Sequence, residues 1–157
     1  MADEIEKYLG RVAQQLQSKS VVAGYVNGAR YPDGEYVAEV AFQDDHGNPA
    51  KRIPPRPFFR NAIAMNREAW KSLVVGGLRA GAATATVVET AGATIVADIQ
   101  KSIRETMSPE LSPVTIANRR DPKLRAAQGK PVNQSTKPLM DTRFMYTQTT
   151  YSVKDEE

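Results

Sequence analysis

Cysteine is absent from this chain of 157 residues, and histidine and tryptophan occur only once each. Without thiols, disulfides and thiolate metal sites are excluded. No apolar stretch approaches the roughly 20 residues that a membrane-spanning helix needs, and the acidic N-terminus carries no apolar signal segment. We therefore expect a protein that is made in the cytoplasm and has no contact with a membrane.

Candidates for catalytic chemistry are equally scarce. The single histidine, His46, lies in the acidic stretch 44–47, and a helix end capped by Gly47 is a simpler interpretation than a metal site. Residues 76–81 hold three glycines without the spacing of a dinucleotide or phosphate loop, so we interpret them as a helix break. With one histidine and no Gly-x-Ser-x-Gly elbow, we expect no enzyme activity, no cofactor and no metal ion.

Charge is unevenly distributed along the chain, although the formal net charge is only +3. Residues 1–50 contain four Lys or Arg and eight Asp or Glu, whereas residues 51–143 contain sixteen and seven. The last fourteen residues are acidic again. Chance differences between solvated faces explain this pattern, and so does electrostatic complementarity between stacked copies of the chain.

The first third of the chain predicts a helix, a strand and a turn. Apolar residues at helical spacing predict an amphipathic helix over residues 3–17, with a stripe of Ile5, Tyr8, Leu9, Val12 and Leu16. The β-branched run 21–26 predicts a strand, and residues 31–34 (YPDG) predict a turn. Residues 35–42 favour a short helix, with a strand as the alternative.

The rest of the chain predicts two long helices, a short helix and a closing strand. We expect Asn61 to cap a helix that runs to Gly76, and residues 84–107 have the clearest helical period. Ser112 and Pro113 predict the start of a short helix. Residues 146–153 alternate like a strand and should pair with 21–26. The expected fold is a single α+β domain over residues 1–157, in which helices flank a small, mostly antiparallel sheet.

Residues 53–60 (IPPRPFFR) form the most unusual segment. Three prolines in four positions exclude a regular helix or central strand, so we expect an extended connector. Such a rigid segment suits an interface, for which the predicted residues are Arg56, Pro57, Phe58, Phe59 and Arg60. The two arginines should pair with carboxylates of an adjacent copy. Alternatively, both phenylalanines fill the monomer core, or one lies inside and one outside.

This octapeptide resembles a signature of the bacteriophage tail-component, tail-completion or neck proteins. Other motifs occur in the order found in that family: residues 31–34 (YPDG) and 37–41 (VAEVA) before it, and Gly92, residues 99–103, 111–117 (LSPVTIA) and 137–142 (KPLMDT) after it. The resemblance covers residues 20–153. The chain departs from the family at Arg143, where glycine is usual, and at residues 44–47, where Asn-Glu-Phe-Gly is frequent.

The resemblance implies a tail-terminator-like, ring-forming fold and a non-enzymatic virion protein. Such a protein completes or terminates the tail and joins it to the head, after assembly in the host cytoplasm. The implied partners are other copies of the chain, six per ring or twelve nearer the portal, and the neighbouring head-tail connector and tail tube proteins. Ring closure needs two different surfaces on each copy, which the acidic and basic flanks supply.

Residues 119–137 show no apolar period and predict a long, irregular basic loop. We interpret it as an arm that becomes ordered on contact with a neighbouring copy, another ring or DNA, with solvated disorder as the alternative. The arm residues are Arg119, Arg120, Lys123, Arg125, Lys130 and Lys137. Their charge allows non-specific contact with genomic DNA, and the alternative function is a DNA-binding assembly accessory protein.

Overall fold

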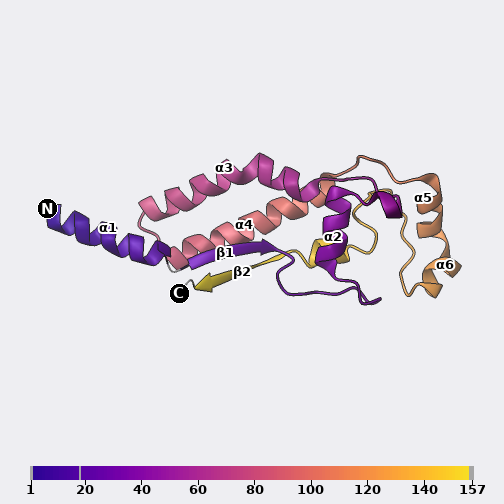
Figure 1. Ribbon diagram of the computed structural model, residues 1–157, viewed down its shortest axis with the longest axis horizontal. Helices are drawn as coiled ribbons and strands as arrows, with labels where there is room; N and C mark the ends of the chain where they lie inside the picture. Colours follow the sequence, from indigo (N-terminus) through magenta and orange to yellow (C-terminus); the bar gives the residue numbers. More distant parts are fainter. Residues whose placement is uncertain (1, 18, 156–157) are drawn as a thin grey trace.

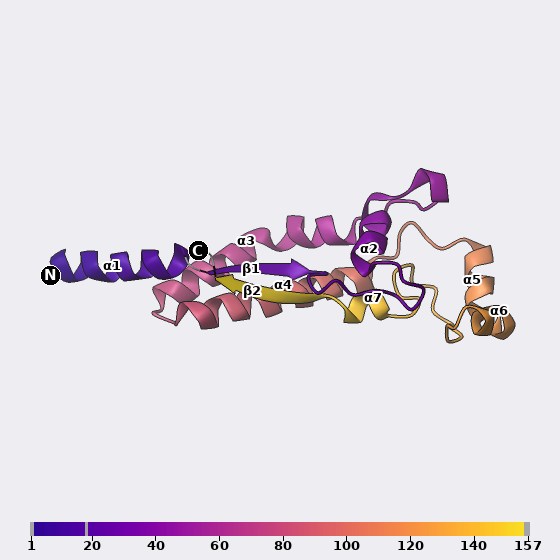
Figure 2. The same cartoon turned by 60° about the horizontal axis from the view of Figure 1, so that its bottom comes forward.

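The computed structural model describes residues 2–17 and 19–155, which form seven α-helices and one two-stranded antiparallel sheet. The α+β class expected from the sequence is confirmed. The molecule is long and narrow, with α1 (Ala2–Gln17) at one end and α5 (Pro113–Arg120) and α6 (Pro122–Ala127) at the other (Figures 1 and 2). No helix in the described part of the chain combines the length and apolar character needed to cross a membrane.

Two long helices, α3 (Phe58–Arg79) and α4 (Thr84–Glu105), form an antiparallel pair along the body (Figure 1). The helix predicted over residues 84–107 is confirmed, and its buried face includes Val88, Ala91, Ile99 and Ile103. The predicted break at residues 76–81 is confirmed, because α3 ends at Arg79 and Gly81 has a φ of 80°, although α3 continues through Gly76 and Gly77. A Cβ at Gly77 would lie 2.9 Å from Cγ2 of Val87, so glycine permits the close approach of the two helices.

The sheet pairs β1 (Lys19–Gly24) with β2 (Thr150–Asp155), in a register that places Val21 opposite Val153. Pairing between the two predicted strand segments is confirmed. The second strand begins later than expected, because the chain forms the short helix α7 (Phe144–Thr147) first. The sheet packs against α4. There, Gly92 leaves room for Tyr151, since a Cβ at residue 92 would lie 2.3 Å from that ring.

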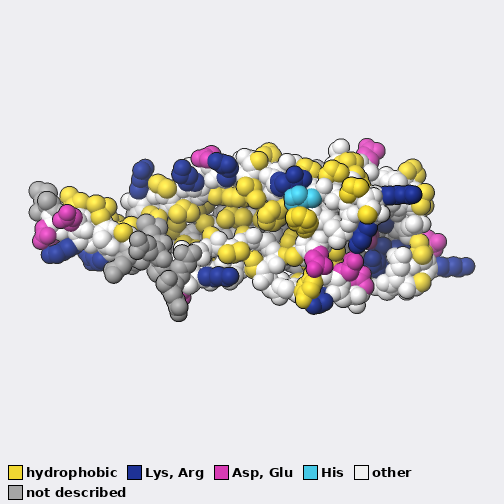
Figure 3. Space-filling model, viewed as in Figure 1, with side chains coloured by type: hydrophobic (Ala, Val, Ile, Leu, Met, Phe, Trp, Pro, Cys, Tyr) yellow, Lys and Arg dark blue, Asp and Glu magenta, His cyan; other side chains and the backbone are white. Residues whose placement is uncertain are grey.

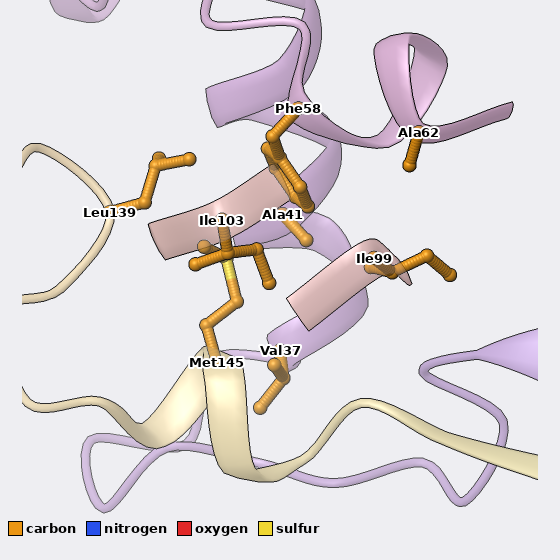
Figure 4. Close-up of a cluster of buried hydrophobic side chains, with 8 residues drawn as sticks. All are labelled: Val37, Ala41, Phe58, Ala62, Ile99, Ile103, Leu139 and Met145. Carbon is orange, nitrogen blue, oxygen red and sulfur yellow. The ribbon is translucent and has the colours of Figure 1, made fainter. Parts of the chain in front are cut away.

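The other half of the body gathers around a compact apolar core (Figure 4). Helix α2 (Val37–His46) confirms the predicted helix, and it ends at Gly47, whose amide donates to the carbonyl of Gln43 over 2.7 Å. A short 3-10 turn (Pro49–Lys51) follows. The core draws on α2, α3, α4, α7 and the segment before α7, and consists of Val37, Ala41, Phe58, Ala62, Ile99, Ile103, Leu139 and Met145.

Helix α1 extends away from this body (Figure 2). Its predicted stripe is present, but Ile5, Tyr8 and Leu9 are exposed by 58%, 48% and 57%. Val12 is partly buried, and the side chain of Leu16 lies outside the described part of the structure. No other described helix or strand packs extensively against α1. The helix is therefore amphipathic without a partner for its apolar face.

Candidate functional site: the proline-framed segment and the arginine clamp

The proline-framed segment, residues 53–60, leads into α3, whose first turn is capped from a distance. Oδ1 of the buried Asp45 accepts hydrogen bonds from the backbone amides of Phe59 (2.8 Å) and Arg60 (3.3 Å). A carboxylate suits the positive end of a helix. Its Oδ2 accepts from Nε of Arg60 over 2.6 Å. Because Asp45 supplies the cap, α3 begins at Phe58, and the prediction that Asn61 caps this helix is wrong.

Two of the predicted interface residues are located inside the monomer. Arg56 is 6% exposed, and its Nε donates to the carbonyl of Pro109 over 2.8 Å. Phe58 is fully buried in the core. Arg56 is therefore occupied within its own chain, which corrects the expected pairing of this residue with an adjacent copy. Its guanidinium joins α3's approach segment to the chain after α4.

The other three predicted interface residues lie nearer the surface. Phe59 is partly buried, and its ring meets that of Phe58 edge to face, with 6.3 Å between the ring centroids. A Cβ at Gly24 of β1 would lie 3.4 Å from the ring of Phe59. Pro57 is partly buried as well. The side chain of Arg60 is half exposed, but its ion pair is formed with Asp45 of the same chain. Of the alternatives raised by the sequence, one phenylalanine inside and one at the surface describes this chain best.

A second polar cluster, which we call the arginine clamp, consists of Arg119, Arg125 and Asp141. Arg119 donates to the carbonyls of Lys137 (2.8 Å) and Pro138 (2.9 Å). Arg125 donates to Oδ2 of Asp141 and to the carbonyl of Pro131, at 3.0 and 2.8 Å. Both arginines are buried, and both form ion pairs with Asp141. Burial of charge is tolerated because both arginines are paired with the same carboxylate; Nη2 of Arg125 and Oδ1 of Asp141 form no hydrogen bond but lie 3.0 Å apart as an ion pair.

The clamp changes the interpretation of the basic arm. The irregular loop predicted over residues 119–137 is wrong for its first half, where α5 ends and α6 follows. Asp121 caps α6 by accepting from the amides of Lys123 and Leu124, with Pro122 at the first helical position. This Asp-Pro pair was a local signal that the sequence reasoning missed.

The arm residues fall into two groups. Arg119 and Arg125 hold the segment against its own chain, and Lys130 is partly buried. Arg120, Lys123 and Lys137 are exposed. Only the exposed group is therefore available to a neighbouring chain or to DNA in this conformation.

A cleft of about 600 Å³ lies between the proline-framed segment and the clamp, with side chains of both charges in its wall. Among them are Asp44, Arg56, Arg119 and Asp141. Burial raises the pKa of Asp44 to about 6, although Arg56 and Arg119 act in the opposite direction. Burial also lowers the pKa of both guanidinium groups. In the described residues, no three His, Cys, Asp or Glu side chains are placed to hold a metal ion.

Arg143, directly after the segment 137–142, adopts the left-handed conformation with φ 60° and ψ 5°. The turn after Thr142 therefore uses the backbone region that favours glycine, even though this chain has arginine there.

No family model, curated protein or solved structure matches this chain. Its function is therefore argued from its geometry and its motifs.

Proposed function

We propose that this chain is a non-enzymatic structural subunit in the neck of a long-tailed bacteriophage virion. Copies form a ring at the head-tail junction, which completes the tail and joins it to the head. The observation that carries the proposal is α1, an amphipathic helix whose apolar stripe is exposed outside the body. A contiguous apolar surface of this kind normally marks an interaction site.

The position of α1 also favours a ring. The helix lies at one end of an elongated body (Figure 1), so a neighbour that receives it on its body binds it with a different surface. Contacts between unlike surfaces add copies in one direction and form a ring when the rotation closes. Six copies are expected, or twelve beside the portal, with connector and tail tube proteins as the neighbouring layers.

The motifs that carry the family resemblance support a structural role. Arg56 ties the entry of α3 to the chain after α4, Gly92 admits Tyr151, and Asp141 holds both arginines of the clamp. Each of these residues fixes the architecture. Such roles fit a protein that has a structural role in the particle.

A DNA-binding accessory protein is the second candidate, and exposed Arg120, Lys123 and Lys137 favour it. Phosphate-driven binding weakens steeply as salt rises. A salt-titrated binding assay with linear duplex DNA therefore tests it: tight binding at low salt that disappears at high salt supports this candidate. Binding that depends on neither salt nor these side chains counts against it.

A cryo-EM reconstruction of the head-tail junction of the parent particle tests the proposed function. We expect the density of this chain to form a closed ring between the portal and the tail tube. Absence of the chain from mature particles would overturn the proposal.

A further inference from the structure

The apolar stripe of α1, formed by Ile5, Tyr8, Leu9 and Val12, calls for a matching surface. The stripe is flanked on its two sides by the exposed acidic residues Glu4 and Glu6. Lys7 lies on the opposite side of the helix, and Arg11 lies about 20° from Glu4 around the axis, so the Glu6 side is the acidic flank of α1. A surface that covers the stripe should therefore be apolar along its floor and basic along its edge.

One face of α3 has this character. Phe59, Ile63, Trp70 and Val74 fall on the same side of the helix. The ring of Phe59 lies beside Gly24, so the Phe59 end of this side faces β1. Ile63 is 40% exposed, and on neighbouring α2 Phe42 is 62% exposed. A hollow of about 180 Å³ lies beside Phe42, lined by Phe42, Phe58 and Phe59 together with Asp45, His46 and Arg60 among others. We call this surface, defined by Phe42, Phe59, Ile63, Trp70 and Val74, the apolar band.

The edge of the apolar band is basic. Arg60, Arg67 and Lys71 follow one another at helical spacing along α3, and all three are exposed. Figure 3 shows hydrophobic side chains as a continuous strip over the middle of the body, with Lys and Arg side chains along its α3 edge. Arg60 is paired with Asp45, whereas the only ion pair of Arg67 is with its exposed neighbour Glu68 among the described residues, and none is found for Lys71 there.

The dimensions of the two surfaces are compatible. At about 1.5 Å per residue, the 16 residues of α1 extend about 24 Å and the 22 residues of α3 about 33 Å. A helix laid in an apolar groove through residues spaced three and four apart is a common recognition mode. The stripe has this spacing, and its acidic flank at Glu6 is opposite in charge to the basic edge of the band.

We infer that α1 of one copy lies on the apolar band of the next copy, with Leu9 near Ile63 and the acidic flank of α1 beside Arg67 and Lys71. The inference rests on the proposed function for its biological setting, since it names the contact that joins neighbouring subunits. Each copy then gives its helix to one neighbour and receives a helix from the other.

Disulfide cross-linking tests this contact cleanly because the natural chain has no cysteine. Full-length Leu9→Cys and Ile63→Cys variants, one of them with a short tag that shifts its mass, are mixed and oxidised. We expect the mixed dimer to form at least about tenfold more than with control pairs, since local concentration is high only where the residues meet. A yield no higher than in the controls would overturn the inference.

The controls use the same helices at positions that face elsewhere. Gly10→Cys replaces a residue of α1 with open space around it, and Met65→Cys replaces an 83% exposed residue of α3 outside the band. A double Leu9→Cys/Ile63→Cys variant tests whether α1 instead folds back onto the apolar band of its own chain. A disulfide formed within single chains at high dilution would overturn the assignment to a second copy.

Charge exchange gives an independent readout by analytical ultracentrifugation. Glu4→Lys/Glu6→Lys should weaken self-association at least about tenfold at low salt, and so should Arg67→Glu/Lys71→Glu. Mixing the two variants should restore association, because the reversed charges complement each other. Failure of the mixture to associate, with each variant folded by circular dichroism, contradicts the contact.

The two proposals fail separately. A ring in the particle with α1 away from the apolar band overturns this inference and leaves the neck function standing. If copies cross-link but the protein is absent from particles, the contact between copies stands and the neck function is overturned.

Discussion

Helix α1 and the segment 113–143 lie at opposite ends of the molecule and differ in where their interactions are made (Figure 1). In the second region, Arg119 and Arg125 are buried and bind carbonyls and a carboxylate of their own chain. In the first, Leu9 is more than half exposed. The two buried arginines are paired within the monomer, whereas the apolar stripe of α1 is left exposed.

This difference teaches that residue type alone predicts exposure poorly at both ends. A basic segment can be an internal brace when carbonyls converge on its guanidinium groups, since arginine has five donors in a rigid fork. An apolar stripe can remain outside when the chain leaves it no partner.

The largest effect is expected when the arginine clamp is broken. Arg125→Ala removes one of the two buried arginines that pair with Asp141 and leaves the carbonyl of Pro131 without its donor, and should lower the free energy of unfolding by about 3–5 kcal/mol. Chemical denaturation measures it. The matched change Arg120→Ala, at an exposed neighbour, should stay within about 0.5 kcal/mol. Equal losses in the two variants would contradict the internal role of Arg125.

Substitutions at two glycines test the difference in packing between the body and α1. Gly92→Ala puts a methyl group against the ring of Tyr151 and should destabilise the protein by about 2–3 kcal/mol. Gly10→Ala meets nothing within 4 Å and should instead stabilise α1, by up to about 1 kcal/mol. Helical content by circular dichroism and thermal unfolding measure the two changes. If both substitutions act in the same direction, the contrast in packing is wrong.

A smaller effect concerns Asp44 in the cleft. Its pKa is raised from 3.8 to about 6 by burial, so the folded state binds the proton more tightly than the unfolded state does. Stability due to this group is therefore present at low pH and lost as pH rises through that window. Asp44→Asn should stabilise the protein by about 1–2 kcal/mol at pH 7.5 and flatten its stability between pH 4 and 6. An unchanged profile of unfolding free energy against pH would exclude Asp44 as its source.

The smallest effect is expected at Arg143. Arg143→Gly removes the strain of a left-handed arginine and should stabilise the fold by about 0.5–1 kcal/mol, after the added entropy of the unfolded chain is deducted. The same replacement at the exposed helical residue Arg67 should destabilise by about 1 kcal/mol. Opposite signs in the two melting curves verify the backbone conformation, and equal signs contradict it.

Local patterns predicted the elements that depend on local physics. The period of α4, the Ser112 and Pro113 start of α5, and the Gly47 end of α2 were all found from neighbouring residues. Pairing of the first strand with the last also followed from alternation. These features need only the residues inside or beside each element.

The misses came from contacts between distant residues, with one exception. The start of α3 depends on Asp45, which caps it from α2, and the burial of Arg56 depends on carbonyls 53 and 54 residues further along. The glycine at position 77 within α3 is explained by a contact with Val87 of the next helix, against which a Cβ would lie. Only α6 had a local signal, in Asp121 and Pro122. In the candidate site, the residues of the proline-framed segment were found from the sequence, and their inward placement was not.

The root of α1 has a mechanical consequence. The helix leads into β1 along nearly the same line, and at that end Lys19 pairs with Asp155 of β2 over 2.6 Å (Figure 2). Tension applied through α1 is directed along β1, at right angles to the hydrogen bonds that join it to β2. These bonds are then strained together and resist as a group, so β1 and β2 separate under such a load only when several hydrogen bonds break at once.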